Sequence, residues 1–236
     1  MDKSAKDPAK IRTMFSTIAP RYDLLNRVLS LGIDSYWRRF AVNQLPKVEN
    51  AKFLDVATGT CEVALEIVKR YPDAKVAGVD FSEGMLELGR EKVRKAGHQG
   101  RIDIRLADVT SLPFEDNTFD ASIIAFGIRN VQDYKKGIAE IGRVVKSGGK
   151  VVILEFTSIQ NRFFKLPYRF YITKVLTFIG EMVSGKKGAY KYLPSSMLEF
   201  PSPVELKKSM EETGLQDVKY YELTLGVTAV HVGTKN

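Results

Sequence analysis

The stretch Phe53–Ala64 (FLDVATGTCEVA) contains residues whose types and order suit binding of a polar ligand. It begins with an apolar run that carries one carboxylate, Asp55. It continues through small residues around Gly59 and Thr60 and ends in apolar residues at helical spacing. This order predicts a buried strand, a tight turn and a helix. Small residues let a ligand approach the backbone, and the amides at the helix start favour an anionic group. The alternative is a turn that is tight for packing reasons only.

The glycine pattern argues against a dinucleotide site. The G-x-G-x-x-G fingerprint needs three glycines, and only Gly59 is present, with Ala57 and Cys61 near the other expected places. Cys61 has no partner base nearby in the sequence, so we interpret it as a small buried residue and not as a nucleophile. No group of histidines, cysteines and acids has metal-ligand spacing, so no metal is predicted.

Two further carboxylates, Asp80 and Asp108, fall at or just beyond predicted strand ends. Asp80 follows Gly59 by 21 residues, a distance at which an acid accepts hydrogen bonds from both hydroxyls of a ribose. Asp108 could accept from an exocyclic amine of a base. The alternative for each is a helix N-cap or a turn acid. Ligands of open α/β sheets bind at the carboxyl ends of the strands, where these acids are expected to meet.

Strands and helices alternate through the middle of the chain. The predicted strands are 52–56, 75–80, 102–106, 119–126, 150–156, 218–225 and 227–233. Helices between the first five indicate parallel βαβ units. The last two strands flank Gly226, and so close a pair should be antiparallel. Ser202 and Glu205 form a capping box at the start of the helix before them, with Pro203 at its first position. The fold class is therefore α/β, with a mainly parallel sheet and an antiparallel last strand.

Two segments add to this core. Residues 7–43 look helical and amphipathic, with breaks expected at Pro20 and Gly32, and residues 1–50 form an N-terminal helical cap. Their polar and aromatic residues, among them Tyr22 and Asp23, suit a site, although they could simply tie helices to the sheet. Residues 158–200 interrupt the alternation with aromatic and basic residues.

Composition places the chain in a broad class. The 236 residues are 44% apolar, with one cysteine and a net charge of +8. This suits one α/β domain in a reducing compartment. We expect no secretory signal and no membrane span, because no long apolar run is present. Seven basic residues against one acid lie between positions 161 and 191. Such a cluster could meet nucleic acid or an anionic membrane surface.

The motifs resemble a known group of enzymes. The order FLDVATGT, VAGVDFSEGMLELG, ADVTSLPFEDNTFD, FGIRNV and SGGKVVILEF resembles class I S-adenosylmethionine-dependent methyltransferases. With FSTIAPRYDLLNRVLSLGIDSYWR before it and YLPSSMLEFP and GVTAVHVG after it, nearly the whole chain is similar to the C-methyltransferases of menaquinone and ubiquinone biosynthesis. The resemblance implies a single domain over 1–236, a Rossmann-like seven-stranded sheet and S-adenosylmethionine as cofactor.

The resemblance also implies site residues. Thr60 would line the cofactor turn, Asp80 the ribose, and Asp108 with Val109 the adenine. The residues assigned to cofactor binding are Asp55, Gly59, Thr60, Asp80, Phe81, Asp108 and Val109. The chain departs from many members in the turn, where it has Thr58-Gly59-Thr60-Cys61, and at Ala125, where many carry serine.

The implied acceptor is a reduced quinone, a phenol with a nucleophilic ring carbon. Transfer from a sulfonium is an in-line displacement, so the site must hold carbon, methyl and sulfur in line. The pKa of a phenol is about 10, and a nearby cation favours the phenolate. Arg129, in the loop after the fourth strand, is the predicted cation; its alternative is a loop salt bridge. Tyr22 and Asp23 are predicted to hold or deprotonate the hydroxyl.

The segment 158–200 is then predicted to be a helical lid over a prenyl tail, resting on an anionic membrane surface. Its alternatives are a homodimer interface and an ordinary core helix. We expect a prenylated quinol as partner, no nucleic acid, and a cytoplasmic protein peripheral on the inner membrane face. Demethylmenaquinol is favoured over 2-polyprenyl-6-methoxy-1,4-benzoquinol. The rival functions are an RNA methyltransferase and a non-catalytic partner protein. His98 is expected to be exposed, and His231 packed in the last strand with a weak substrate-pocket alternative.

Overall fold

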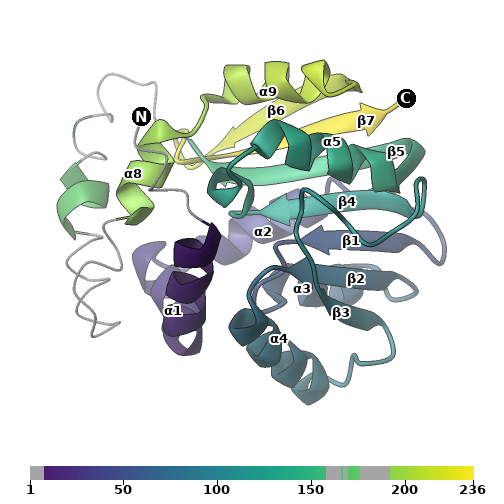
Figure 1. Ribbon diagram of the computed structural model, residues 1–236, viewed down its shortest axis with the longest axis horizontal. Helices are drawn as coiled ribbons and strands as arrows, with labels where there is room; N and C mark the ends of the chain where they lie inside the picture. Colours follow the sequence, from purple (N-terminus) through teal and green to yellow (C-terminus); the bar gives the residue numbers. More distant parts are fainter. Residues whose placement is uncertain (1–7, 158–165, 167–169, 176–191) are drawn as a thin grey trace.

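The computed structural model describes residues 8–157, 166, 170–175 and 192–236 of the chain. Its seven strands are β1 Lys52–Val56, β2 Lys75–Asp80, β3 Ile102–Leu106, β4 Phe119–Ala125, β5 Val145–Phe156, β6 Leu215–Leu223 and β7 Thr228–Lys235. They form one sheet in the order β3-β2-β1-β4-β5-β7-β6 (Figure 1). β1 to β5 pair in parallel, and β7 is antiparallel to both β5 and β6. The predicted fold class is confirmed.

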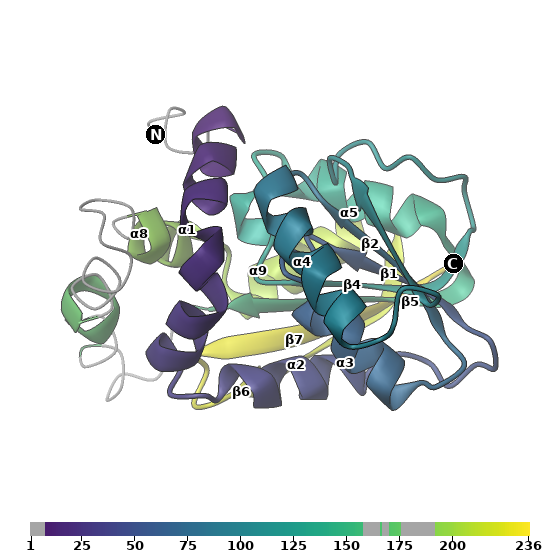
Figure 2. The same ribbon diagram turned by 90° about the horizontal axis from the view of Figure 1, so that it is seen from below.

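Helices cover both faces of the sheet. The described helices are α1 Pro8–Leu29, α2 Asp34–Val42, α3 Glu62–Arg70, α4 Glu83–Lys95, η2 Ile128–Asn130, α5 Tyr134–Val144, η3 Tyr171–Val175, α8 Tyr192–Glu199 and α9 Pro203–Glu212. α2 and α3 pack on one face, and α5 and α9 on the other (Figure 2). Alternation along β1 explains this: Phe53 enters one apolar core and Leu54 the other. α1 lies across the carboxyl-end edge of the parallel strands (Figure 1).

The prediction that Pro20 breaks the first helix is wrong. α1 runs continuously from Pro8 to Leu29 with Pro20 inside it. Ile18 and Leu25, on either side of the proline, are buried in a small core with Met197. This packing offsets the hydrogen bond that a proline removes. The predicted break at Gly32 is confirmed, because Gly32 has a positive φ of 79° between α1 and α2.

Some element boundaries also differ from the predicted ones. β5 begins at Val145 and contains the predicted 147–149 turn as an irregularity, since Phe119 pairs with Val145 and Ala121 with Lys150. β6 and β7 each shift by one to three residues, and their antiparallel pairing is confirmed. The capping box of Ser202 and Glu205 is present at the start of α9. Most of the predicted 158–200 insertion lies outside the described residues.

Candidate functional site

The turn after β1 is forced into a left-handed backbone. Ala57, Gly59 and Cys61 all have positive φ, of 52°, 54° and 65°. The turn packs closely on the loop after β4, because a Cβ on Gly127 would lie 2.4 Å from the Cβ of Ala57. Gly127 is therefore required by close approach. The predicted strand, tight turn and helix are confirmed.

Asp55 holds this turn together from behind. Its Oδ2 accepts from the Thr58 hydroxyl at 2.5 Å and from the Ala64 amide at 3.0 Å. Burial raises the pKa of Asp55 to about 7, and these two hydrogen bonds oppose the shift. Asp55 does not line the cavities that the described residues form beside the turn. The structure thus places Asp55, a predicted cofactor residue, behind the residues that line the cavities.

Asp80 lies on the surface of the site, at the end of β2. Its Oδ2 accepts from the amide of Gly59, and its Oδ1 from that of Ser82, both at 2.9 Å. The side chain is 7% exposed, and burial raises the pKa of Asp80 to about 6. The residue therefore fixes the β1 turn against the start of α4 and still faces a cavity.

A cavity of about 340 Å³ opens at the carboxyl ends of β1, β2 and β4. That volume lies at the small end of the range for ligand sites, roughly 300–1,000 Å³. Its walls are mostly apolar, with Asp80 and Asp108 among the polar groups; they include Ile11, Val56, Phe81, Val109, Ile124 and Val131. Four predicted cofactor residues, Asp80, Phe81, Asp108 and Val109, are thus brought together. Asp108 uses Oδ1 to accept from the amide and the hydroxyl of Thr110, each at 2.8 Å.

A smaller cavity of about 40 Å³ adjoins the first and shares Ala57, Asp80, Phe81, Gly127 and Asn130 with it. Its remaining walls are Phe15, Tyr22, Gly59, Met85, Ala125 and Phe126. Phe15 and Tyr22 come from α1, so the N-terminal cap closes this part of the site. Burial raises the pKa of Tyr22, while a hydrogen bond from Asn26 and the positive charge of Arg129 oppose the rise.

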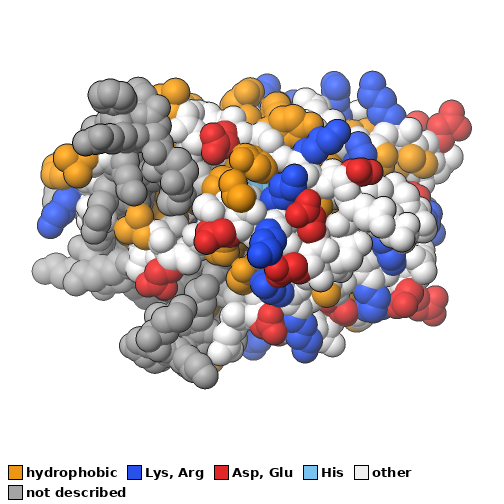
Figure 3. All heavy atoms as spheres, turned by 90° about the horizontal axis from the view of Figure 1, so that it is seen from above, with side chains coloured by type: hydrophobic (Ala, Val, Ile, Leu, Met, Phe, Trp, Pro, Cys, Tyr) orange, Lys and Arg blue, Asp and Glu red, His pale blue; other side chains and the backbone are white. Residues whose placement is uncertain are grey.

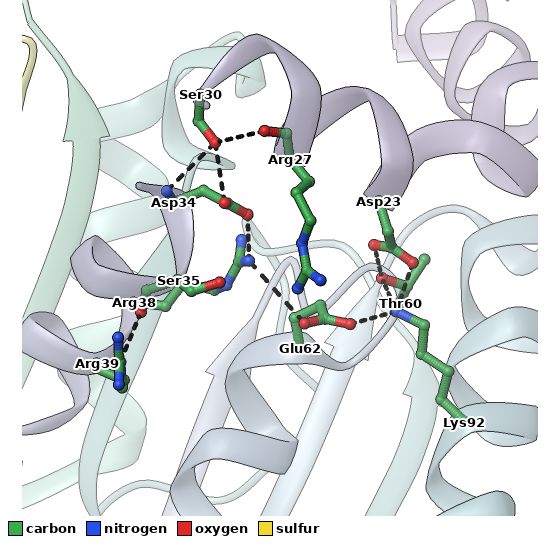
Figure 4. Close-up of polar contacts among 10 residues, drawn as sticks. All are labelled: Asp23, Arg27, Ser30, Asp34, Ser35, Arg38, Arg39, Thr60, Glu62 and Lys92. Carbon is green, nitrogen blue, oxygen red and sulfur yellow. Dashed lines mark hydrogen bonds and ion pairs between the residues drawn. The ribbon is translucent and has the colours of Figure 1, made fainter. Parts of the chain in front are cut away.

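Asp23, next to Tyr22, points away from the smaller cavity and toward Thr60 and Lys92. Its Oδ1 accepts from the Thr60 hydroxyl at 2.7 Å, and its Oδ2 lies 2.5 Å from the Lys92 ammonium. Lys92 also contacts Glu62 at 2.5 Å (Figure 4). Neither Asp23 nor Thr60 lines a cavity as the described residues define them. These two predicted site residues join α1 to the turn.

Arg129 is 4% exposed and paired. Its Nη1 donates to the Phe126 carbonyl and to Oε1 of Glu155, both at 2.6 Å. Its guanidinium carbon lies 5.3 Å from the centre of the Phe156 ring. The loop salt bridge, which was the alternative role of Arg129, is therefore present. Its neighbours Phe126 and Asn130 line the smaller cavity, although Arg129 does not.

Glu155 and Lys92 were not predicted from the sequence as residues of the site. Glu155 is the one charged residue within the apolar run 151–156, which was a usable signal of a buried pair. Lys92 is one of several basic residues in the second half of α4, and nothing in the sequence distinguishes it from its neighbours.

The remaining candidates do not add to the site. Cys61 is buried, which raises the pKa of its thiol to about 12, so it is an inert small residue as expected. His231 is buried, and its Nε2 contacts the Pro203 carbonyl at 2.9 Å. His98 was expected to be exposed, but it is half-buried because its ring contacts the Arg101 guanidinium. Neither histidine lines the cavities beside the turn. Among the described residues, no three metal-ligating side chains gather, and no helix is long and apolar enough to cross a bilayer.

Comparison with known proteins now decides the family. A model of the ubiE/COQ5 methyltransferase family matches residues 3–235. The chain belongs to this family. It is 50% identical to the ubiquinone/menaquinone biosynthesis C-methyltransferase UbiE of Geotalea daltonii, over all of both chains. It is 47% identical to the demethylmenaquinone methyltransferase of Thermus thermophilus, over 94% of this chain and all of that one.

Solved structures of more distant proteins share the fold. A crystal structure of an S-adenosylmethionine-dependent methyltransferase from Thermotoga maritima, a possible histamine N-methyltransferase, superposes with a TM-score of 0.66. The two share 20% identity over 95% of this chain and 99% of that one, which establishes the fold alone. This ubiE/COQ5 family member is therefore an S-adenosylmethionine-dependent methyltransferase with the class I fold.

Proposed function

We propose that this methyltransferase acts on a ring carbon of a prenylated, demethylated quinol, with demethylmenaquinol as the favoured acceptor. The alternative acceptor is 2-polyprenyl-6-methoxy-1,4-benzoquinol. The names of the similar proteins include both quinone routes. One observation carries the proposal: two cavities of unequal size meet at Asp80 and Gly127, and the smaller is walled by aromatic rings beside a buried arginine.

The larger cavity suits the nucleoside part of the cofactor. The Asp80 carboxylate would accept from the ribose hydroxyls, and Asp108 with Val109 would face the base. Phe81 and Gly59 would border the cofactor where the two cavities meet. The fit is supported by apolar walls around one buried carboxylate, and by Gly127, which leaves no room for a larger side chain. Asp55 and Thr60 would act from behind, by shaping the turn.

Bound S-adenosylmethionine supplies an electrophilic methyl group on a sulfonium. The chain's own task is to hold a phenol so that one ring carbon faces that methyl, and to favour the phenolate. The smaller cavity, of about 40 Å³, has room for the hydroxyl-bearing edge of the ring and not for the whole quinol. Phe15 and Phe126 would flank that edge, and the Tyr22 hydroxyl would hydrogen-bond the phenol oxygen. Arg129 cannot act as a base, because a guanidinium stays protonated. Its charge would stabilise the developing phenolate, as it already favours ionisation of Tyr22.

We further propose one domain in which α1 covers the site and the 158–200 segment covers the prenyl tail at an anionic membrane surface. Among the described residues of that segment, Leu166 is 77% exposed and Phe170 is 64% exposed. On the end of α1 and the turn after it, Leu24 and Leu31 are 57% and 83% exposed. Exposed leucines and phenylalanines of this kind suit a bilayer interface.

Nucleic acid is not proposed as a partner. On the face that carries α9, acidic and basic side chains are interspersed (Figure 3). Lys135 pairs there with Glu212, and Lys207 with Glu211. A nucleic-acid interface requires a patch or stripe of basic residues, and paired charges reduce the positive field.

The test is a competition assay under reducing conditions. The protein receives labelled S-adenosylmethionine together with short-tailed demethylated naphthoquinol and benzoquinol. We expect label in the naphthoquinol first. Label only in the benzoquinol would reverse the order of acceptors. If the cofactor binds and neither quinol is labelled, the proposed acceptor class is wrong.

A further inference from the structure

A buried ion pair joins the end of β5 to the loop after β4. Glu155 is 1% exposed and Arg129 is 4% exposed. Oε1 of Glu155 accepts from Arg129 Nη1 at 2.6 Å and from the Phe156 amide at 2.8 Å. Oε2 accepts from the Arg129 amide at 3.3 Å. Glu155 therefore fixes both the backbone and the guanidinium of Arg129.

Such a pair is poorly explained by stability alone. Removing two charges from water costs about as much as, or more than, the pair regains, and apolar residues in the same place are often as stable. The four residues before Glu155 in β5, Val151 to Leu154, are all apolar and buried. A further apolar residue would continue that pattern, so the carboxylate at position 155 calls for a reason beyond packing.

The arginine is not saturated by this pairing. Its Nε is buried and has no hydrogen-bond partner among the residues that the structure describes. Buried donors are nearly always paired, so an unpaired one needs an explanation. The guanidinium is thus held by its Nη1 on Glu155 and Phe126, over the Phe156 ring, with donor capacity left over.

The charge of Arg129 reaches the smaller cavity. Phe126 and Asn130, which flank Arg129 in the sequence, line that cavity together with Tyr22. Arg129 favours ionisation of the Tyr22 hydroxyl, against the effect of burial. The Tyr22 side chain is itself a phenol. A quinol hydroxyl in the same cavity would meet the same field, to which Arg129 contributes most, Arg38 adds and Asp80 is opposed.

We propose that Glu155 is a positioning residue for methyl transfer: it holds the Arg129 guanidinium beside the smaller cavity and limits the positive potential that a bound phenol meets there. The inference rests on the proposed function, because it takes the smaller cavity as the place of the quinol hydroxyl. Glu155 itself touches neither cavity as the described residues define them, so it acts only through Arg129.

Glu155→Gln separates this role from a purely structural one. Glutamine keeps the size and one acceptor oxygen but removes the negative charge, so Arg129 becomes uncompensated. The matched control is Glu140→Gln, because Glu140 on α5 is half-buried, pairs with Arg143 and lines neither cavity, and neither residue acts on Tyr22. Both variants change a glutamate that is paired with an arginine into glutamine. Only the first lies beside the proposed quinol site.

The measurement is the pH dependence of kcat for the quinol, because kcat reports ionisation in the enzyme–quinol complex; KM is reported separately. The acidic limb of this profile is the rise in rate as the bound phenol ionises. In Glu155→Gln this limb should move to lower pH by on the order of one unit, because the electrostatic field at the phenol is more positive. The plateau of kcat should fall about 10- to 100-fold, since Arg129 loses its main anchor. Glu140→Gln should leave the limb in place. A limb that stays at the wild-type pH in Glu155→Gln, with a folded protein, overturns the proposal.

Two further arms keep the test decisive. If Glu155→Gln does not fold, Glu155→Asp keeps the charge and shortens the reach, and should lower kcat without moving the limb; unchanged kcat contradicts the proposal. If the wild-type protein methylates no quinol, the proposed function fails and the role of Glu155 is tested separately. Ultraviolet titration of each protein against its Tyr22→Phe counterpart then reports Tyr22, whose ionisation should move to lower pH in Glu155→Gln. No movement would overturn the inference.

Discussion

Oδ2 of Asp23 lies 2.5 Å from Nζ of Lys92, and this ion pair joins the N-terminal cap to the cofactor half of the molecule. The same ammonium contacts Glu62 at the start of α3 at 2.5 Å and the Thr60 hydroxyl at 3.2 Å (Figure 4). One side chain of α4 therefore holds together α1, the β1 turn and α3. Because α1 contributes Tyr22 to the smaller cavity, this cluster couples the turn to the proposed acceptor site.

Lys92→Met is expected to weaken binding of the cofactor product S-adenosylhomocysteine by about 3- to 10-fold, with faster dissociation. The variant removes the charge that holds α1 over the site. The arrangement seen in the structure, with α1 covering the site, is therefore less populated. Titration calorimetry and stopped-flow dissociation measure the two effects. Arg90→Met is the control, because Arg90 pairs with Glu83 on the surface of the same helix and does not reach α1. Equal affinities for both variants would contradict the role of Lys92.

Asp80→Asn should weaken cofactor binding by about 10- to 100-fold, because an ionised acceptor of ligand hydroxyls becomes a neutral one. The wild-type affinity should depend on pH. Burial raises the pKa of Asp80 to about 6, so the ionised form is lost as the pH falls through that value, and binding should weaken with it. The variant should show no such dependence. Asp103→Asn, at an exposed carboxylate of β3, should bind like the wild type throughout.

The sequence predicted the positions of the strands along the chain well, because apolar runs and turn residues are local signals. β1, β2 and β3 have the predicted bounds, and the antiparallel end follows from the short connection at Gly226. Pro20 shows the limit of local rules. A proline normally ends a helix, but α1 is held by packing of Ile18 and Leu25 against Met197, far along the chain.

The three strand-end acids show what a sequence cannot separate. Asp55, Asp80 and Asp108 all lie at or just beyond the carboxyl end of a strand, yet only the last two line the larger cavity. Asp55 turns inward because the Thr58 hydroxyl and the Ala64 amide are its nearest donors. That choice depends on the left-handed backbone of the turn, which non-glycine residues adopt here. Asp23 likewise turns away from the cavities because it pairs with Lys92. Lys92 is 69 positions away in the sequence, and only the fold brings it close.

Asp55→Asn should change the pH dependence of stability. Burial raises the pKa of Asp55 from 3.8 to about 7, so between these values the folded chain binds the proton more tightly than the unfolded chain does. The wild-type free energy of unfolding therefore falls, through this residue, as the pH rises through that window. Asparagine cannot ionise. The stability of the variant relative to the wild type should rise by up to about 1.4 kcal/mol per pH unit in the window and level off above it.

Urea unfolding at several pH values measures that difference. Asp103→Asn serves again as control, because its exposed carboxylate should give a nearly constant difference from the wild type across the same window. A constant difference for Asp55→Asn as well would mean that Asp55 ionises near its ordinary pKa, and that its two hydrogen bonds fully compensate for burial.

Tyr22→Phe should lower kcat by about 10- to 100-fold and leave cofactor affinity within about twofold of the wild type, because a positioned hydroxyl acts on the acceptor and not on the cofactor. The ring itself stays, so its edge contact with Phe15, at 6.0 Å between centroids, is kept. Steady-state kinetics with the quinol, beside calorimetry with S-adenosylhomocysteine, separate the two effects. Tyr36→Phe is the control, since Tyr36 is 48% exposed on α2. A Tyr22→Phe enzyme with full kcat would show that the hydroxyl neither holds the phenol nor takes part in its ionisation, and Arg129 would then be the remaining predicted group beside the acceptor.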